Sequence, residues 1–292
     1  MQILGLDFTS APRKSKPITV AHGALTGNRL VIESLATIPD FDGVRALLSS
    51  RGPWIAGLDF PFGLPRNFLE AVGWSGSWAD QAERVSKMSK GEFESVLVAF
   101  KAGQPDGQKE LLRRTDRPTR AKSPLKLNNP PVGKMYFEGV RLLLNSEASV
   151  LPCRPSESDC VICESYPAVP ARLLIGQTTY KNDSKKKQTI SQLEARQAIL
   201  RGISTPQFEH SYHISVSIDP VVVGAAISDP SGDTLDAILA CIQVASASLD
   251  STGRFYIPED VDPCEGWIAD AVIFDQLDEV EHHLATVSRR SH

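Results

Sequence analysis

The order of apolar runs in the first sixty residues limits the fold more than any other feature of the sequence. Residues 2–8 form an apolar run typical of a β-strand, and β-branched runs at 18–25 and 29–38 predict a hairpin that follows it. Residues 40–50 carry apolar side chains at helical spacing, and residues 54–60 are nearly all apolar, as in a central strand covered on both faces. This order predicts an α/β protein whose mixed sheet has three antiparallel strands and then parallel strands, with helices on its faces.

The remainder of the chain is less regular. Prolines, glycines and charged residues interrupt the pattern over residues 66–158, which predicts an insertion of short helices and loops. An apolar run at 161–167 predicts the next strand, and residues 233–249 form the clearest amphipathic helix. Residues 259–292 are acidic. Because no internal repeat is visible, we expect a single domain over residues 1–292 that contains the insertion and ends in the acidic segment.

The composition is that of an ordinary globular protein, with 41% hydrophobic and 23% charged residues. No run approaches the roughly 20 apolar residues that cross a bilayer, and the amino terminus lacks the pattern of a signal peptide. The five cysteines are an odd number in a long chain, which does not suggest a disulfide scaffold. We therefore expect a cytoplasmic protein that does not act at membranes.

The tetrapeptide Gly-Leu-Asp-Phe occurs twice, each time at the end of a predicted strand. Its aspartates are Asp7 and Asp59, and Glu164 lies in the predicted strand at 161–167. If these strands are parallel neighbours, their carboxyl ends meet at one edge of the sheet, where open α/β sheets bind ligands. The repeated tetrapeptide therefore predicts a group of carboxylates at that edge.

Two further acids, Asp233 and Asp236, lie three residues apart at the start of the helix predicted for 233–249 and so share one side of it. Five converging carboxylates repel one another unless cations neutralise them. Mg²⁺ and Mn²⁺ prefer oxygen ligands, and two such ions about 4 Å apart promote attack of water on a phosphodiester. The five acids therefore predict a catalytic site that depends on Mg²⁺ or Mn²⁺.

Most of these acids also have an interpretation that involves no chemistry. Asp7 could accept hydrogen bonds from its own turn, and Asp59 could form the turn that continues as Phe-Pro-Phe-Gly. Asp233 could be a helix N-cap or a first-turn acid that the helix dipole stabilises. Asp236 is harder to explain in this way because it adjoins the apolar side of its helix. The hypothesis of a catalytic site therefore rests on the set of acids.

Short motifs along most of the chain resemble two related groups of proteins. The helix start DTLDAILA resembles the Asp-x-x-Asp-Ala opening of RuvC-type Holliday-junction resolvases, and GLDF is similar to the metal-binding first strand of the ribonuclease H-like superfamily. GLDFTSAP, GLDFPFGLP, RRTDRPT, ESYPAVPARLL, DTLDAILA and CEGWI resemble the family catalogued as domain of unknown function 429, regarded as predicted ribonuclease H-like nucleases. The resemblance implies a ribonuclease H-like fold.

The same resemblance implies a set of site residues. The metal ligands would be Asp7, Asp59 and Asp236, with Asp233 and Glu164 as additional catalytic members. The chain departs from the resolvases in its long insertion between the fourth and fifth predicted strands, and in having Phe-Thr-Ser after Asp7 in place of an Asp-Pro-Gly-like turn. A junction substrate is therefore not implied.

A basic segment at residues 113–126 lies within the predicted insertion. Arginine pairs with phosphate oxygens through its forked N–H groups, so Arg114 and Arg117 are candidate contacts to a substrate phosphate. Lys186, in a second basic run, is a further candidate. Both runs could equally be solvated surface segments, and their few aromatic residues do not predict stacking on single-stranded bases.

These features predict a metal-dependent nuclease or phosphodiesterase whose partner is DNA or RNA. An alternative is an ATPase or phosphotransferase of the actin-like branch, which shares the order of core strands. Such an enzyme should have glycine-rich phosphate turns, whereas Phe-Thr-Ser follows Asp7, and the sequence contains no GxxxxGK[ST] loop. A third hypothesis is a non-catalytic nucleic-acid-binding or adaptor protein. Incubation with Mg²⁺ or Mn²⁺ and a panel of DNA, RNA and ATP distinguishes the three, by cleavage of nucleic acid, by turnover of ATP alone, or by no turnover.

Overall fold

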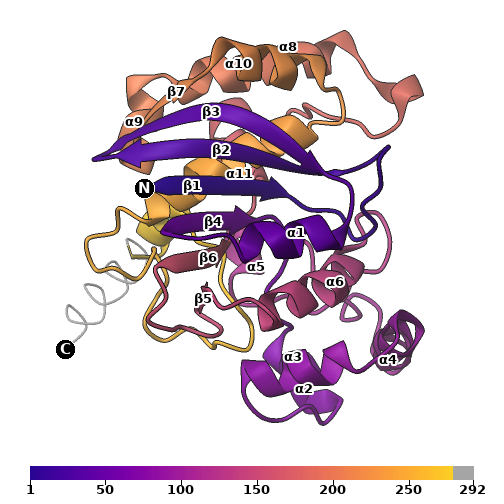
Figure 1. Cartoon of the computed structure of the whole chain (residues 1–292). Helices are drawn as coiled ribbons and strands as arrows, with labels where there is room; N and C mark the ends of the chain where they lie inside the picture. The colour runs from indigo at the N-terminus through magenta and orange to yellow at the C-terminus, as the bar shows by residue number, and fades with distance from the viewer. Residues whose placement is uncertain (279–292) are drawn as a thin grey trace, which may run out of the picture.

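A single mixed sheet forms the centre of the molecule (Figure 1). The computed structural model describes residues 1–278, with Lys185 as backbone only. The strand order is β5-β6-β4-β1-β2-β3-β7, in which β1, β2 and β3 are antiparallel, and β4, β6 and β5 run parallel to β1. The predicted fold class is confirmed, and the sheet is consistent with a ribonuclease H-like fold. The strands are β1 (Gln2–Asp7), β2 (Ile18–Thr26), β3 (Arg29–Ile38), β4 (Trp54–Leu58), β5 (Ser149–Leu151), β6 (Cys160–Glu164) and β7 (Ser215–Ile218).

Helices cover both faces of this sheet. One face carries α1 and α6, with α3 packed on α6, and the other packs against α11, with α10 beside β3 and α8 packed on α10 (Figure 1). The α-helices are α1 (Phe41–Leu48), α2 (Arg66–Ala71), α3 (Trp78–Ser86), α4 (Lys90–Ala102), α5 (Asp116–Thr119), α6 (Val132–Leu144), α7 (Ala168–Ile175), α8 (Ile190–Ile203), α9 (Pro206–Tyr212), α10 (Pro220–Ser228) and α11 (Asp233–Ala247), and η1 (Lys185–Lys187) is a 3₁₀ turn.

The period of two along β1 assigns its side chains to the two faces. Leu4 and Leu6 belong to the core that contains α1 and α6. Ile3 belongs to the core that contains α11, so the next odd positions, Gly5 and Asp7, also point toward that helix. The same alternation holds along β4. The two aspartates of the repeated tetrapeptide are therefore on the face that α11 covers.

The glycines of the repeated tetrapeptide let α11 approach the sheet closely. Gly5 pairs with Gly57 across the parallel strands β1 and β4. A β-carbon at Gly5 would lie 2.1 Å from the carbonyl oxygen of Ala237, and one at Gly57 would lie 2.7 Å from that of Ala240. Both contacts are shorter than van der Waals distance, so a larger residue at either position would push the helix away. The repeat therefore fixes the position of α11 over the ends of both strands.

Two short strands were not predicted. β5 lies within residues 66–158, the range predicted as an insertion, and pairs in parallel with β6 at the edge of the central sheet. β7 pairs in parallel with β3 at the opposite edge. Helices α2, α3 and α4, which belong to residues 66–158, lie at the end of the molecule farthest from β7 (Figure 1).

The start of the acidic segment predicted for 259–292 packs against the sheet. The backbone of Ala269 donates a hydrogen bond of 2.9 Å to the carbonyl oxygen of Glu164, and Trp267 is buried. Residues 279–292 of that segment lie outside the described residues. No helix within residues 1–278 combines the length and the apolar character that a membrane span requires.

Candidate metal centre

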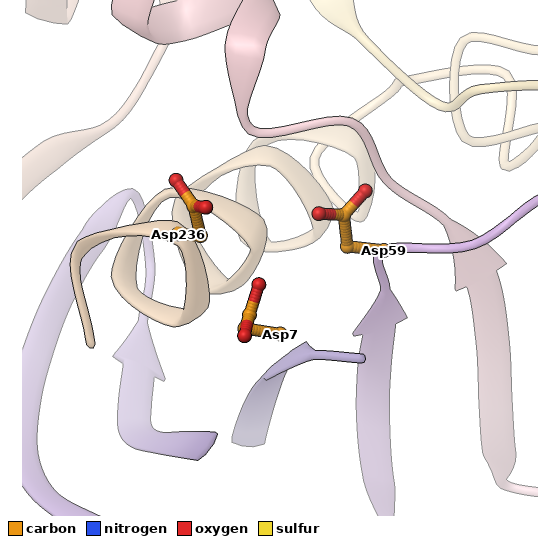
Figure 2. A group of neighbouring side chains, drawn as sticks. All are labelled: Asp7, Asp59 and Asp236. Carbon is orange, nitrogen blue, oxygen red and sulfur yellow. The ribbon is translucent and has the colours of Figure 1, made fainter. Parts of the chain in front are cut away.

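Three aspartates from three different elements meet at the carboxyl edge of the sheet (Figure 2). Asp7 ends β1, Asp59 directly follows β4, and Asp236 is in the first turn of α11. One carboxylate oxygen from each lies within 4.8 Å of those of the other two. We call these three residues the carboxylate cluster. From this spacing, small movements of the side chains would let the three oxygens share one small cation.

The backbone of the sheet positions the first two members. Leu6 pairs with Leu58 in the parallel ladder, and the amide of Asp59 donates a hydrogen bond of 3.1 Å to the carbonyl oxygen of Leu6. Because Asp7 and Asp59 follow these paired residues, they leave neighbouring strands at the same level and on the same face. Gly5 and Gly57, each two residues before one of these aspartates, let the first turn of α11 come close to both carboxylates.

Burial and mutual repulsion perturb the ionisation of the carboxylate cluster. The pKa of Asp7 is raised well above its usual value, first by burial and then by the negative charges of Asp236 and Asp233. Burial, followed by the charge of Asp236, raises the pKa of Asp59 to about 7. Within residues 1–278, neither the Asp7 nor the Asp59 carboxylate accepts a hydrogen bond that would favour its charged form. An external cation would relieve both effects.

Asp236 differs from the other two because both of its oxygens have partners. The hydroxyl of Tyr180 donates a hydrogen bond of 2.5 Å to Oδ1, and the ammonium of Lys181 pairs with Oδ2. Burial lowers the pKa of Lys181, but the charge of Asp236 raises it, and the net shift is upward. The chain therefore provides one cation of its own beside three carboxylates.

The carboxylate cluster opens into a cavity of about 870 Å³. Its walls come from the segments after β1 and β4, the start of α7, and residues 176–184, which contribute more of the lining than any other segment. Lys122 and Arg172 belong to the lining, together with Lys181 and Lys187. The cavity therefore combines carboxylates at its base with cationic side chains on its walls.

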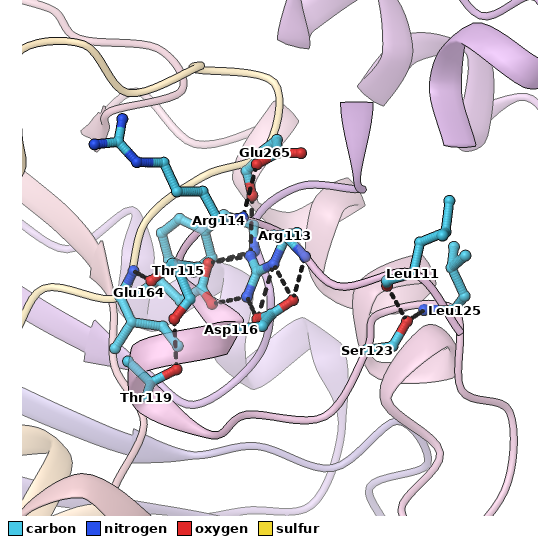
Figure 3. A network of polar contacts seen from close by, with 12 residues as sticks. Leu111, Arg113, Arg114, Thr115, Asp116, Thr119, Ser123, Leu125, Glu164 and Glu265 are labelled. Atoms are coloured by element: carbon cyan, nitrogen blue, oxygen red, sulfur yellow. Dashed lines mark hydrogen bonds and ion pairs between the residues drawn. The ribbon is translucent and has the colours of Figure 1, made fainter. Parts of the chain in front are cut away.

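Glu164 lies at the same edge of the sheet but outside the carboxylate cluster. Its register partner in β4 is Leu58. The guanidinium of Arg113 donates hydrogen bonds of 2.6 and 2.8 Å to its two oxygens, and the amide of Phe62 donates another of 2.8 Å (Figure 3). Arg113 also pairs with Asp116 at 2.8 Å. We call Arg113, Asp116 and Glu164 the arginine cluster; within it the predicted catalytic Glu164 already has a cationic partner.

Asp233 lies beside the carboxylate cluster and also outside it. It is half-buried, and burial raises its pKa while the charge of Lys16 acts in the opposite direction. Gly232 is the N-cap of α11, and a carboxylate oxygen of Asp229 accepts a hydrogen bond of 2.8 Å from the amide of Thr234. As a structural residue, Asp233 could be either the N-cap of this helix or an acid in its first turn. It lies in the first turn and is not the N-cap.

The three predicted substrate contacts lie outside the cavity lining. Arg114 pairs with Asp260 at 2.8 Å, and its guanidinium lies 5.9 Å from the centre of the Trp267 ring. Arg117 is exposed on α5, and Lys186 is exposed in η1. Contacts of these three side chains with a substrate remain predictions.

Sequence reasoning missed three residues that the structure brings to the site. Tyr180 and Lys181 contact Asp236 from a loop without periodicity. Ser165 follows Glu164 and lines the cavity; its buried hydroxyl has no hydrogen-bond partner in the described part of the chain. Since buried polar groups are normally hydrogen-bonded, this hydroxyl is available to a ligand or to water. The ESYP motif was the only signal that pointed toward it.

The donor set fits a hard divalent cation. All three ligand atoms are carboxylate oxygens, the type that Mg²⁺ and Mn²⁺ prefer, and histidine and cysteine are absent from the group. The surrounding cavity leaves room for water and for phosphate oxygens to complete the coordination shell. The carboxylate cluster therefore has the ligand chemistry and spacing of a Mg²⁺ or Mn²⁺ site.

Fold and site together define an α/β protein with a mixed seven-stranded sheet and an acidic cluster at its carboxyl edge. The family model described as protein of unknown function DUF429 matches residues 5–262, and the chain belongs to this family. No curated protein and no solved structure matches the sequence significantly. The match includes all three members of the carboxylate cluster and also the arginine cluster.

Proposed function

We propose that the protein is a divalent-metal-dependent phosphodiesterase that cleaves nucleic acid. One observation carries the proposal: Asp7, Asp59 and Asp236 converge within 4.8 Å at the base of a cavity with cationic walls. Anionic ligands for a metal ion and cationic contacts for a phosphate are the two requirements of metal-assisted phosphodiester hydrolysis. A metal site with a purely structural role would need the anionic ligands but not the cationic contacts.

The carboxylate cluster would hold and orient the ion. Three rigid elements carry the ligands, so their relative positions are set by the sheet and by the contact of α11 with Gly5 and Gly57. Bound Mg²⁺ or Mn²⁺ would supply Lewis-acid polarisation of the phosphate and activation of water. Asp233, whose charge acts on Asp7, is a further carboxylate that could contribute to a second ion.

The walls of the cavity would orient the phosphodiester. Arg172 is held by a hydrogen bond to the carbonyl oxygen of Thr119 and by the ring of Tyr166, whose centre is 5.6 Å from its guanidinium carbon. Lys122 adds a second cation, and the unpartnered hydroxyl of Ser165 adds a neutral donor. These groups recognise phosphate without reading a base, which favours a substrate class defined by its backbone.

The test is cleavage of a panel of DNA, RNA and ATP by the purified protein with Mg²⁺ or Mn²⁺. We expect cleavage of nucleic acid that EDTA abolishes. Asp7→Asn should lower the rate at least about a hundredfold, because even the outer-shell partners of metal ligands contribute factors of this order. Asp42→Asn is the matched control, since Asp42 is an exposed acid on α1 whose side chain is 85% exposed.

Two outcomes would contradict the proposal. Equal cleavage by Asp7→Asn and wild type would show that the carboxylate cluster is not the active site. Turnover of ATP with intact DNA and RNA would instead support the phosphotransferase alternative.

A further inference from the structure

Lys181 occupies the position beside Asp236 that a metal ion would need. Asp236 is 1% exposed on its side chain, and its Oδ2 accepts from the Lys181 ammonium while Oδ1 accepts from the Tyr180 hydroxyl. An ammonium only donates hydrogen bonds, so it neutralises the carboxylate without helping a second cation to bind. A metal ion that uses Oδ2 of Asp236 must therefore compete with Lys181.

The backbone that carries Lys181 is fixed. The guanidinium of Arg196 donates a hydrogen bond of 2.8 Å to the carbonyl oxygen of Tyr180. The side-chain amide of Gln192 donates a hydrogen bond of 3.1 Å to the carbonyl oxygen of Lys181. The next residue, Asn182, donates its backbone N–H to Pro230 at 3.0 Å. Movement of the ammonium away from Asp236 therefore has to occur by rotation of the lysine side chain.

The glycine at position 232 leaves room for that side chain. Gly232 has φ +81°, and a β-carbon there would lie 2.7 Å from the β-carbon of Lys181, so the absence of a side chain makes room for the lysine stem. The Lys181 side chain is nevertheless 44% exposed, and it lines the cavity. Lys181 can therefore reach either the carboxylate cluster or the space where a phosphate would bind.

We propose that Lys181 is a tethered cation that exchanges between these two places. In the metal-free protein it neutralises Asp236; when a divalent ion binds, repulsion between the two cations drives the ammonium into the cavity, where it contacts the phosphate of the substrate. The proposal rests on the proposed function. It makes Lys181 a competitor of the metal and a catalytic residue that contacts the substrate.

Calorimetric titration with Mn²⁺ tests the competition without requiring turnover. Lys181→Met and Lys181→Gln should both bind Mn²⁺ more tightly than wild type, with a dissociation constant lower on the order of tenfold, as expected when one charge-assisted hydrogen bond no longer has to be broken. The matched control is Lys16→Met. Lys16 also lines the cavity and its charge also acts on Asp7, but it pairs with Asp183 at 2.8 Å.

The control separates direct competition from a change of net charge. If Lys16→Met tightens Mn²⁺ binding as much as Lys181→Met does, the effect is long-range and the exchange is overturned. Weaker binding by the Lys181 variants would overturn it too, because it would show that Lys181 only positions Asp236. If neither wild type nor any variant binds Mn²⁺, the proposed function fails along with the exchange.

Turnover of bis(p-nitrophenyl) phosphate at saturating Mn²⁺ tests the contact with phosphate. Lys181→Met should turn over this phosphodiester probe at least about tenfold more slowly than wild type, although it binds the metal more tightly. Tighter metal binding with slower turnover is a combination that a structural role does not produce. Equal turnover would overturn the phosphate contact and leave the competition standing. No turnover by wild type would overturn the phosphate contact and count against the phosphodiesterase, with the titration still deciding the competition.

Discussion

The arginine cluster and the carboxylate cluster are two groups of buried or half-buried acids at the same edge of the sheet, and the chain neutralises their charges differently (Figures 2 and 3). In the arginine cluster, the guanidinium of Arg113 donates hydrogen bonds to both Asp116 and Glu164. A backbone amide donates a further hydrogen bond to each of these carboxylates. In the carboxylate cluster, Asp236 is the only member with hydrogen-bond donors from residues 1–278, which are the Tyr180 hydroxyl and the Lys181 ammonium. In the arginine cluster each carboxylate has a guanidinium and an amide as partners, whereas in the carboxylate cluster one ammonium, that of Lys181, stands beside three carboxylates.

This difference supports the proposal that the arginine cluster is structural and that the carboxylate cluster binds an external ion. Buried acids tolerate desolvation when a guanidinium and amides solvate them in place of water. The pKa of Arg113 shows the same balance: burial lowers it, but the charges of Asp116 and Glu164 raise it well above its usual value. Within residues 1–278, Asp7 and Asp59 lack such partners, and their pKa values are raised. Burial also raises the pKa of Glu164, but there Arg113 and the amide of Phe62 act against the increase.

The largest expected effect comes from breaking the arginine cluster. Arg113→Met would leave Glu164 and Asp116 buried beside a neutral side chain, which should lower the free energy of unfolding by about 3 to 5 kcal/mol. Urea unfolding measures this change. The matched control is Arg114→Met, which removes an exposed pair with Asp260 and should cost about 1 kcal/mol or less. Equal losses in the two variants would contradict a structural role for the arginine cluster.

A smaller effect with a defined dependence on pH is expected in the carboxylate cluster. The pKa of Asp59 is raised to about 7 in the folded protein, so the folded state holds the proton more tightly than the unfolded state does. The stability that this proton gives is fully present below about pH 4 and is lost as the pH rises to about 7. In EDTA at pH 8, Asp59→Asn should therefore be more stable than wild type by on the order of 2 kcal/mol, and its stability should vary less with pH.

Thermal unfolding in EDTA between pH 4 and pH 8 measures this difference, with Asp42→Asn as the exposed control. Addition of Mn²⁺ at pH 8 should stabilise the wild type and not Asp59→Asn, because a ligand stabilises only the folded state that binds it. Wild-type stability that increases with pH in EDTA, relative to Asp59→Asn, would contradict the repulsion inferred for the carboxylate cluster.

The fold was predictable where the sequence pattern is local. The first three strands and β4 are continuous apolar or β-branched runs, α1 has apolar side chains at helical spacing, and the order of these elements gives the mixed sheet. The strands that were missed, β5 and β7, have three and four residues, too few to show a period. Their pairing depends on neighbours distant in the chain, which local patterns do not encode.

The sequence predicted those residues of the candidate site that lie at the ends of strands. Asp7 and Asp59 follow from the repeated tetrapeptide, and Asp236 from its position on α11. Arg113 stands in a segment that reads as a basic surface, and its burial depends on Glu164, which is 51 residues away. Lys181 lies in a loop without a pattern. Long-range ion pairs therefore decided which charged residues belong to the site, and the sequence alone does not specify them.

Anomalous diffraction from crystals grown with Mn²⁺ tests the central claim most directly. We expect a manganese peak about 2.0 to 2.3 Å from one oxygen each of Asp7, Asp59 and Asp236, with the Lys181 ammonium turned away from Asp236. Absence of a peak at these residues under saturating Mn²⁺, or a peak bound to Glu164 in place of them, would contradict it.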